Sequence, residues 1–307
     1  MISSEELKAY VEANPSLIKM RESTGYPGLY VIKYQRRVFY DNRWDKFLVE
    51  ARGLVVDENY EAVIRPFTKI FNRFENNTDI ERDEPVIAVG KVNGFMAAAT
   101  HVNGHGWVVS TTGSLDSDFV QIAKKYITPD ILRVLGSRIP DKKITWLFEI
   151  VDPTDPHIIP EKPGAYLIGA RVVTHSADYS SNAIREDWLD NVALSAGLMR
   201  PLWKEARFGD IVKEVKDCQH EGFVVYGKHT SLKIKSPYYL VSKFLARMNS
   251  EKLASMLEKP AIMKQRIEEE HYQLVDFLVA NKDEFLNLGE QARLIFIRQY
   301  FERIMME

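Results

Sequence analysis

The sequence predicts an α+β protein in which antiparallel sheets with flanking helices are followed by a small all-α region. Three observations support this prediction. Short runs rich in β-branched and aromatic residues recur between residues 30 and 240. Asn103-Gly104, a dipeptide typical of tight hairpin turns, separates two of these runs. After Pro237, apolar residues recur at helical spacing, and glycine and proline become rare. We therefore divide the chain into a first domain, residues 1–239, and a helical domain, residues 240–307.

The strand candidates share a high β-propensity and are bounded by turn-forming residues. Phe95 to Val102 and Trp107 to Thr111 flank the Asn-Gly turn and predict a hairpin. The other candidates are Leu54–Val56, Ala62–Ile64, Ile144–Val151, Tyr166–Val173, Gly222–Tyr226 and Leu232–Ile234.

The helix candidates carry start signals or apolar residues at a spacing of three or four. Ser3 and Glu6 have the spacing of a capping box, which predicts a helix from there to about Asn14. Leu115 to Ile127 is predicted to form a helix that stops before Pro129. Apolar residues at helical spacing predict further helices at Ile184, Trp188 and Val192, at Leu274, Phe277 and Leu278, and at Leu294, Ile297, Phe301 and Ile304.

The composition excludes several classes of protein. The 307 residues include 41 Lys and Arg against 43 Asp and Glu, a formal net charge of −2. This balance disfavours a protein that coats nucleic acid through bulk charge, but it permits an enzyme with a local cationic cleft. The single cysteine excludes an internal disulfide framework. Without a signal peptide or a long apolar run, we expect a cytoplasmic protein that does not enter a membrane.

Five charged residues are embedded in strand-like, apolar surroundings. Lys91 lies between Gly90 and Gly94, and the others are Glu149, Glu221, Lys233 and Lys235. Because burial of an unpaired charge is costly, such residues should be exposed, paired or gathered at a site. Alternation places Lys233 and Lys235 on one face of their strand, where their charges repel unless an anion lies between them. A phosphate is the natural candidate for that anion.

In order and spacing, these residues resemble the motifs of the covalent nucleotidyltransferases, which include ATP-dependent DNA and RNA ligases and mRNA capping enzymes. Lys91-Val92-Asn93-Gly94 is similar to the nucleophile motif, and Phe148-Glu149, Glu221-Gly222 and Lys233-Ile234-Lys235 are similar to three later motifs. The segments Glu50-Ala51-Arg52-Gly53, Lys69-Ile70-Phe71-Asn72 and 145–154 are most similar to the phage-type RNA ligase 1 family. The resemblance covers roughly residues 30 to 240.

The resemblance implies an ATP-grasp-like nucleotidyltransferase fold and an ATP-dependent RNA ligase that acts through a lysine–AMP intermediate. It implies ATP and Mg2+, or Mn2+, as cofactors. The implied substrate is RNA with 5′-phosphate and 3′-hydroxyl ends, single-stranded or in a nicked tRNA loop, and we expect a monomer with a role in RNA repair. The implied roles are Lys91 as nucleophile, Glu149 at the ribose, Glu221 at the metal, Lys233 and Lys235 at the α-phosphate, Arg52 and Lys69 at phosphate or ribose, and Arg171 at a 5′-phosphate.

The nucleophile must be a neutral amine, although the reference pKa of lysine is about 10.4. Cations nearby depress such a pKa, and Lys233, Lys235 and Mg2+ could supply them around Lys91. Two positions depart from the family pattern: Asn93 stands where an acid is usual, and Phe95 where Ser or Thr is usual. They bear on metal and ribose contacts rather than on the nucleophile.

Several alternatives stay open at this point. Phe148 could stack on adenine or belong to the core. Lys33, Arg36, Arg37 and Arg43 alternate with Tyr34, Phe39, Tyr40 and Trp44, which could form a strand-binding surface or a solvated face. The chain could also be a DNA ligase or a capping-type transferase, although residues 240–307 do not show the short strands of an appended β-barrel. A non-catalytic RNA-binding protein on a ligase fold is a further alternative.

Overall fold

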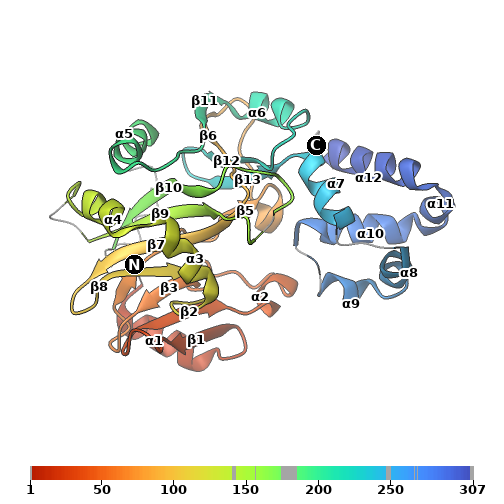
Figure 1. Ribbon diagram of the computed structural model, residues 1–307. Helices are drawn as coiled ribbons and strands as arrows, with labels where there is room; N and C mark the ends of the chain where they lie inside the picture. The colour runs from red at the N-terminus through yellow and green to blue at the C-terminus, as the bar shows by residue number, and fades with distance from the viewer. Residues whose placement is uncertain are drawn as a thin grey trace. The chain divides into compact units, whose positions relative to one another are not determined.

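The computed structural model describes residues 2–139, 143–155, 157–173, 185–246, 250–265, 267 and 269–304 (Figure 1). The chain forms two compact units. Unit 1 contains Met1–Ile70 and Val92–Leu202, and unit 2 contains Phe71–Lys91 and Trp203–Glu307. The chain therefore passes from unit 1 to unit 2 and back before it ends in unit 2.

Unit 1 contains two four-stranded antiparallel sheets. The first has the strand order β1-β2-β3-β4, and the second has the order β10-β9-β7-β8. The strands of the first sheet are β1 (Ile18–Glu22), β2 (Tyr30–Tyr34), β3 (Arg52–Val56) and β4 (Ala62–Ile64). Those of the second are β7 (Phe95–Val102), β8 (Gly106–Thr111), β9 (Ile144–Val151) and β10 (Gly164–Val172). The helices are α1 (Ser4–Ala13), α2 (Arg37–Tyr40), α3 (Asp118–Tyr126), α4 (Pro129–Gly136) and α5 (Glu186–Ala196).

Side chains along each strand of unit 1 point alternately to the two faces of its sheet, and each face packs against a different layer. Val31 and Val55 of the first sheet share a hydrophobic cluster with Ala98 and Leu147 of the second, so the two sheets pack face to face. The outer face of the first sheet packs on α1 and α2. The outer face of the second packs on α3, α4 and α5.

Unit 2 contains a five-stranded sheet with the order β11-β6-β12-β13-β5. It is antiparallel except for the short pairing of β13 with β5. Its strands are β5 (Phe71–Asn72), β6 (Pro85–Gly90), β11 (Trp203–Arg207), β12 (Gly222–Tyr226) and β13 (Ser231–Lys235), accompanied by η1 (Glu75–Asn77) and α6 (Phe208–Glu214).

The remainder of unit 2 is helical (Figure 1). Its elements are α7 (Pro237–Ala246), α8 (Ser250–Glu258), α9 (Pro260–Lys264), η3 (Glu269–His271), α10 (Tyr272–Ala280), α11 (Lys282–Asn287) and α12 (Glu290–Ile304). α7 contacts both α12 and η3, and stacked Phe277 and Tyr300 join α10 to α12 with ring centroids 4.6 Å apart. Among the described residues, no helix is long and apolar enough to cross a membrane.

The predicted fold class, antiparallel sheets with flanking helices followed by a helical region, is confirmed. The capping box at Ser3 and Glu6 is present, and the Asn103-Gly104 turn joins β7 to β8. The predicted helix at residues 115–127 begins three residues later than expected, at Asp118. Ile184, one of the residues used to predict α5, lies outside the described residues. The boundary at residue 240 stays a prediction.

Candidate active site

Lys91 follows directly after β6 at an accessible position of unit 2. Its backbone N–H donates to the carbonyl of Gly222 at 2.9 Å, which ties it to the start of β12. Its Nζ lies 3.1 Å from Oε2 of Glu221, the residue before that strand. The Lys91 side chain is 21% exposed, whereas that of Glu221 is 2% exposed. The structure thus holds a reachable amine against a buried carboxylate.

Lys233 and Lys235 lie on β13, which pairs with β12. Lys235 is opposite Gly222 and Lys233 is opposite Val224, so alternation places both lysines on one face, as predicted. Lys235 is buried, and its Nζ lies 3.5 Å from Oε1 of Glu221. Glu221 therefore faces both Lys91 and Lys235.

Sequence reasoning missed Glu270 of η3. Its Oε1 accepts hydrogen bonds from Nζ of Lys235 at 2.7 Å and from Nζ of Lys243 on α7 at 3.1 Å. Burial alone would lower the pKa of Lys235, but the carboxylates of Glu270 and Glu221 outweigh burial and raise that pKa. Burial alone would raise the pKa of Glu270, but Lys235 and Lys243 hold it well below its usual value. Lys235 and Glu270 are therefore both charged at neutral pH.

In unit 1, the backbone of Gly94 contacts the side chain of Glu149 and fixes its position. The backbone N–H of Gly94 donates to Oε1 of Glu149 at 3.3 Å. A Cβ atom at Gly94 would come within 2.9 Å of the carbonyl carbon of Ile150 and 3.2 Å of Cγ of Glu149. The glycine is thus needed because the chain after Lys91 passes directly over the end of β9.

Phe148 and Glu149 point to opposite faces of β9. Phe148 is fully buried and belongs to the hydrophobic cluster that α3, α4 and α5 cover, together with Trp146 and Ile150. Glu149 is half-buried on the other face. Of the two interpretations of Phe148, this placement favours a core residue over an adenine-stacking one.

Lys69 and Arg52 lie in unit 1, near the first sheet. The backbone N–H of Lys69 donates to the carbonyl of Val49 at 2.7 Å. Its Nζ lies 4.5 Å from the ring centroid of Phe39 and 5.1 Å from that of Trp44. Aromatic faces attract cations at this distance, so part of the aromatic run before residue 45 holds Lys69. Arg52 opens β3 and is half-buried.

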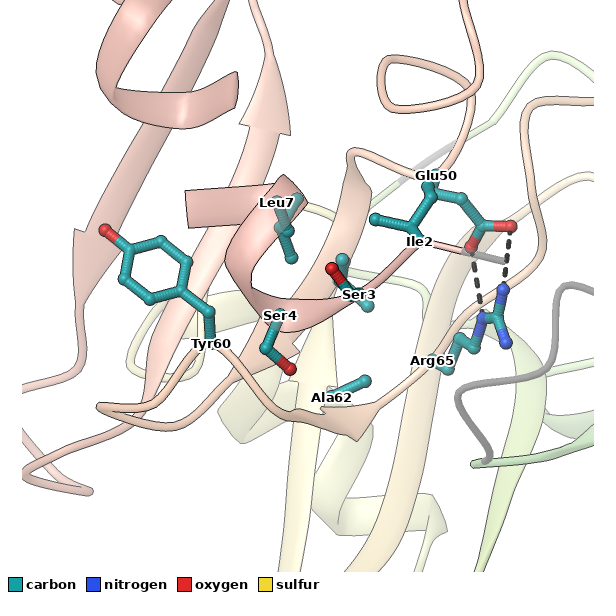
Figure 2. A pocket seen from close by; sticks show the side chains of 9 residues that line it. Ile2, Ser3, Ser4, Leu7, Glu50, Tyr60, Ala62 and Arg65 are labelled. Carbon is teal, nitrogen blue, oxygen red and sulfur yellow. Dashed lines mark hydrogen bonds and ion pairs between the residues drawn. The ribbon is translucent and has the colours of Figure 1, made fainter. Parts of the chain in front are cut away.

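Arg171 belongs to a buried ion-pair network that sequence reasoning did not find. Nε and Nη2 of Arg65 each lie 3.2 Å from a carboxylate oxygen of Glu50 (Figure 2). Nη2 of Arg171 lies 3.5 Å from Oε1 of the same glutamate. Nη1 of Arg171 also donates to the carbonyl of Pro66. Glu50 and Arg65 line a small pocket beside the start of α1, as Figure 2 shows. The volume of this cavity is about 40 Å³. These contacts anchor residues 65 and 66, three residues before Lys69.

The two departures from the family pattern have structural roles here. Oδ1 of buried Asn93 accepts a hydrogen bond from the backbone N–H of Ile159 at 3.1 Å. The ring of Phe95 packs edge-on against Phe119 of α3, with centroids 4.9 Å apart. Both side chains therefore secure the segment that follows Lys91.

Comparison with known proteins identifies the family. The sequence model described as RNA ligase matches residues 50–239, which contain Lys91, Glu149, Glu221, Lys233 and Lys235. The chain belongs to the RNA ligase family. No curated protein matches the sequence.

Solved structures share the fold of this RNA ligase family member at low sequence identity. Form 1 of an archaeal ATP-dependent RNA ligase is 15% identical with a TM-score of 0.57, covering 97% of this chain and 78% of that one. Form 2 is 16% identical with a TM-score of 0.57, covering 99% and 78%. A candidate ATP-dependent DNA ligase from Aquifex aeolicus is 12% identical with a TM-score of 0.56, also covering 99% and 78%.

The sequence-based recognition of the RNA ligase family is confirmed by the family match. The ligase fold is also confirmed. The predicted enzyme class, an ATP-dependent RNA ligase, agrees with the family match and with the archaeal RNA ligase structures. At this identity the solved structures establish the fold alone, and RNA and DNA ligases share it. The assignment of RNA rather than DNA as the substrate therefore rests on the family match.

Proposed function

We propose that this RNA ligase family member joins 5′-phosphate and 3′-hydroxyl RNA ends with ATP, through a covalent Lys91–AMP intermediate. The observation that carries the proposal is the cluster of Lys91, Glu221 and Lys235 within the stretch matched by the family. A reachable amine beside a buried cation, and next to a buried carboxylate that can bind a divalent metal, suits attack on the phosphate of a metal-bound nucleotide.

The proposed reaction has three steps. Lys91 Nζ attacks the α-phosphorus of ATP, a P–N bond forms, and the bond to the β-phosphate breaks with release of pyrophosphate. The RNA 5′-phosphate oxygen then attacks the same phosphorus, and the P–N bond breaks. Finally, the RNA 3′-hydroxyl oxygen attacks the 5′-phosphate, loses its proton and displaces AMP.

The roles of the other residues in these steps are part of the proposal. Lys233 and Lys235 would stabilise negative charge that develops on the α-phosphate. Glu149, oriented by Gly94, would accept hydrogen bonds from the ribose hydroxyls. Arg52 and Lys69 would contact phosphate or ribose. We assign Arg171 to anchoring the segment before Lys69, because Glu50 and Pro66 engage its guanidinium.

Glu221 is the residue that fits a divalent cation. Mg2+ binds through one or two carboxylates together with substrate phosphates and water, so one buried carboxylate near the amine suffices. Among the described residues, no group of three or more acids, histidines or cysteines could hold a metal by itself. A divalent cation there would neutralise the triphosphate and compete for Glu221, which would free the Lys91 side chain from its ion pair.

A joining assay tests the proposed function. Single-stranded RNA with a 5′-phosphate is incubated with the protein, ATP and Mg2+, in parallel with DNA of the same sequence. We expect joined or circular RNA from the wild type and from Lys8→Ala, a control at an exposed lysine. We expect none from Lys91→Ala. Joined DNA without joined RNA would overturn the assignment to RNA.

The other expectations stay predictions. We expect a monomer in the cytoplasm, a role in RNA repair, and a separate domain at residues 240–307. Size-exclusion chromatography with light scattering tests the oligomeric state. Limited proteolysis near residue 240 tests the domain boundary.

A further inference from the structure

A chain of alternating charges leads from Lys91 into the helical part of unit 2. Lys91 pairs with Glu221 at 3.1 Å, Glu221 lies 3.5 Å from Lys235, Lys235 pairs with Glu270 at 2.7 Å, and Glu270 pairs with Lys243 at 3.1 Å. The last two residues belong to η3 and α7, outside the stretch that the family model matches. We propose, on the basis of the proposed ligase function, that Glu270 is a positioning residue that holds Lys235 for adenylyl transfer to Lys91.

Glu270 is the closer of the two carboxylates that face Lys235. The side chains of Lys235 and Glu270 are each 8% exposed, so water screens their interaction little. Charge-assisted hydrogen bonds of this length are among the stronger ones in proteins and are directional. The side chain of lysine is flexible, and its position is therefore set by the partner that holds its ammonium group. Glu270 meets this requirement for Lys235.

The position of Glu270 is in turn fixed by the neighbouring His271. Nε2 of His271 lies 3.2 Å from the carbonyl oxygen of Leu240 on α7, so the imidazole ring donates a hydrogen bond from this nitrogen. The ring also packs between Phe244 of α7 and Phe301 of α12, at 5.7 and 6.2 Å between centroids. Burial lowers the pKa of His271, so the ring is neutral at neutral pH and does not compete with the lysines for Glu270.

If Glu270 had only a structural role, its important partner would be Lys243 rather than Lys235. Lys235 and Lys243 both lie close to the ring of Tyr239, at 5.3 and 5.1 Å. Loss of the Glu270 charge would therefore leave two buried cations near each other. Such a change could destabilise the helical part without any specific effect on Lys235.

A double substitution separates the two roles. Glu270→Gln keeps the size of the side chain but removes its charge. Lys243→Met, added to it, removes one of the two buried cations that have lost the Glu270 carboxylate and should restore much of the lost thermal stability. The rate of Lys91–AMP formation at saturating ATP should nevertheless stay at least about 10-fold below the wild type, because Lys235 still lacks its nearer carboxylate and keeps only the longer contact with Glu221.

The matched control is Asp276→Asn. Asp276 of α10 also accepts from a lysine, Lys264 at 2.6 Å, and this pair is separate from the chain of charges described above. Its adenylylation rate should stay within about 2-fold of the wild type, as expected for an exposed ion pair. If the Glu270→Gln/Lys243→Met protein regains both stability and rate, Glu270 serves Lys243 and the proposal is wrong.

Amine footprinting tests the same contact without any reaction. The nucleotide-free proteins are treated with an acylating reagent, and modification of Lys235 is followed by mass spectrometry. We expect slow acylation in the wild type and Asp276→Asn, and about 10-fold faster acylation in Glu270→Gln/Lys243→Met, because the Lys235 side chain has lost the nearer of the two carboxylates that hold its amine in place. Equal rates would overturn the proposal. A wild type that protects Lys235 but forms no Lys91–AMP would instead refute the proposed function alone.

Discussion

Substitution of Gly94 by alanine should disable the site without unfolding the protein. The new Cβ would lie 2.9 Å from the carbonyl carbon of Ile150, whereas carbon atoms in contact lie about 3.5–4.0 Å apart. It would also press on Cγ of Glu149 at 3.2 Å. The contact atoms belong mainly to the backbone of β9, so side-chain rotation cannot relieve the clash.

The Cβ would come closer still to the carbonyl oxygen of Ile150, so the required displacement is roughly 1 Å. A misplacement of about 1 Å can reduce an enzymatic rate about 100-fold. Because the Gly94 N–H also orients Glu149, the displacement moves both the segment after Lys91 and the proposed ribose contact. We expect the rate of Lys91–AMP formation in Gly94→Ala to fall by about this factor.

The assay follows transfer of label from α-labelled ATP to the protein on denaturing gels, with a thermal melt by circular dichroism in parallel. Gly289→Ala is the control, because within the described part of the chain, its immediate neighbours aside, nothing lies within 4 Å of the Cβ it would add. It should react like the wild type. If Gly94→Ala reacts as fast as Gly289→Ala, the close approach at β9 has no bearing on the site.

Three further substitutions test the account. Phe148→Ala should lower the free energy of unfolding by about 3–5 kcal/mol in urea titrations, because Phe148 is fully buried; a near-native stability with weaker ATP binding would favour adenine stacking instead. Glu50→Gln should cost about 3–5 kcal/mol because it removes the carboxylate that pairs with the buried guanidinium of Arg65, while the exposed Asp187→Asn should cost about 0–1 kcal/mol. Burial holds the pKa of His271 in the folded protein below its usual value of about 6.5, so the unfolded chain takes up a proton first as the pH falls. The free energy of unfolding should therefore decrease below about pH 6.5, by up to about 1.4 kcal/mol per pH unit. His271→Gln should lack that slope, and an identical pH dependence of the two proteins would contradict the assignment.

The motif residues could be predicted from the sequence because their signals are local. A charged residue in an apolar strand, or a glycine beside a lysine, is visible within a few positions, and strand alternation then places Lys233 and Lys235 on one face. The hairpin at Asn103-Gly104 and the capping box at Ser3 are equally local.

The partners of these residues could not be predicted, because tertiary packing brings them together. Glu270 is 35 residues from Lys235, and Glu50 is 121 residues from Arg171. Nothing in the amphipathic pattern of the helical part marks one glutamate among several as buried. The division into two units, with residues 71–91 in the second, likewise follows from strand pairing across the chain.

The most direct test of the central claim is to locate the covalent intermediate. The wild-type protein is incubated with ATP and Mg2+, digested, and its peptides are analysed by mass spectrometry for an added AMP. We predict AMP on the peptide that contains Lys91, joined through a bond that is labile in acid, as expected for a phosphoramidate. AMP on another residue, or no protein-bound AMP under conditions in which RNA is joined, would contradict the account.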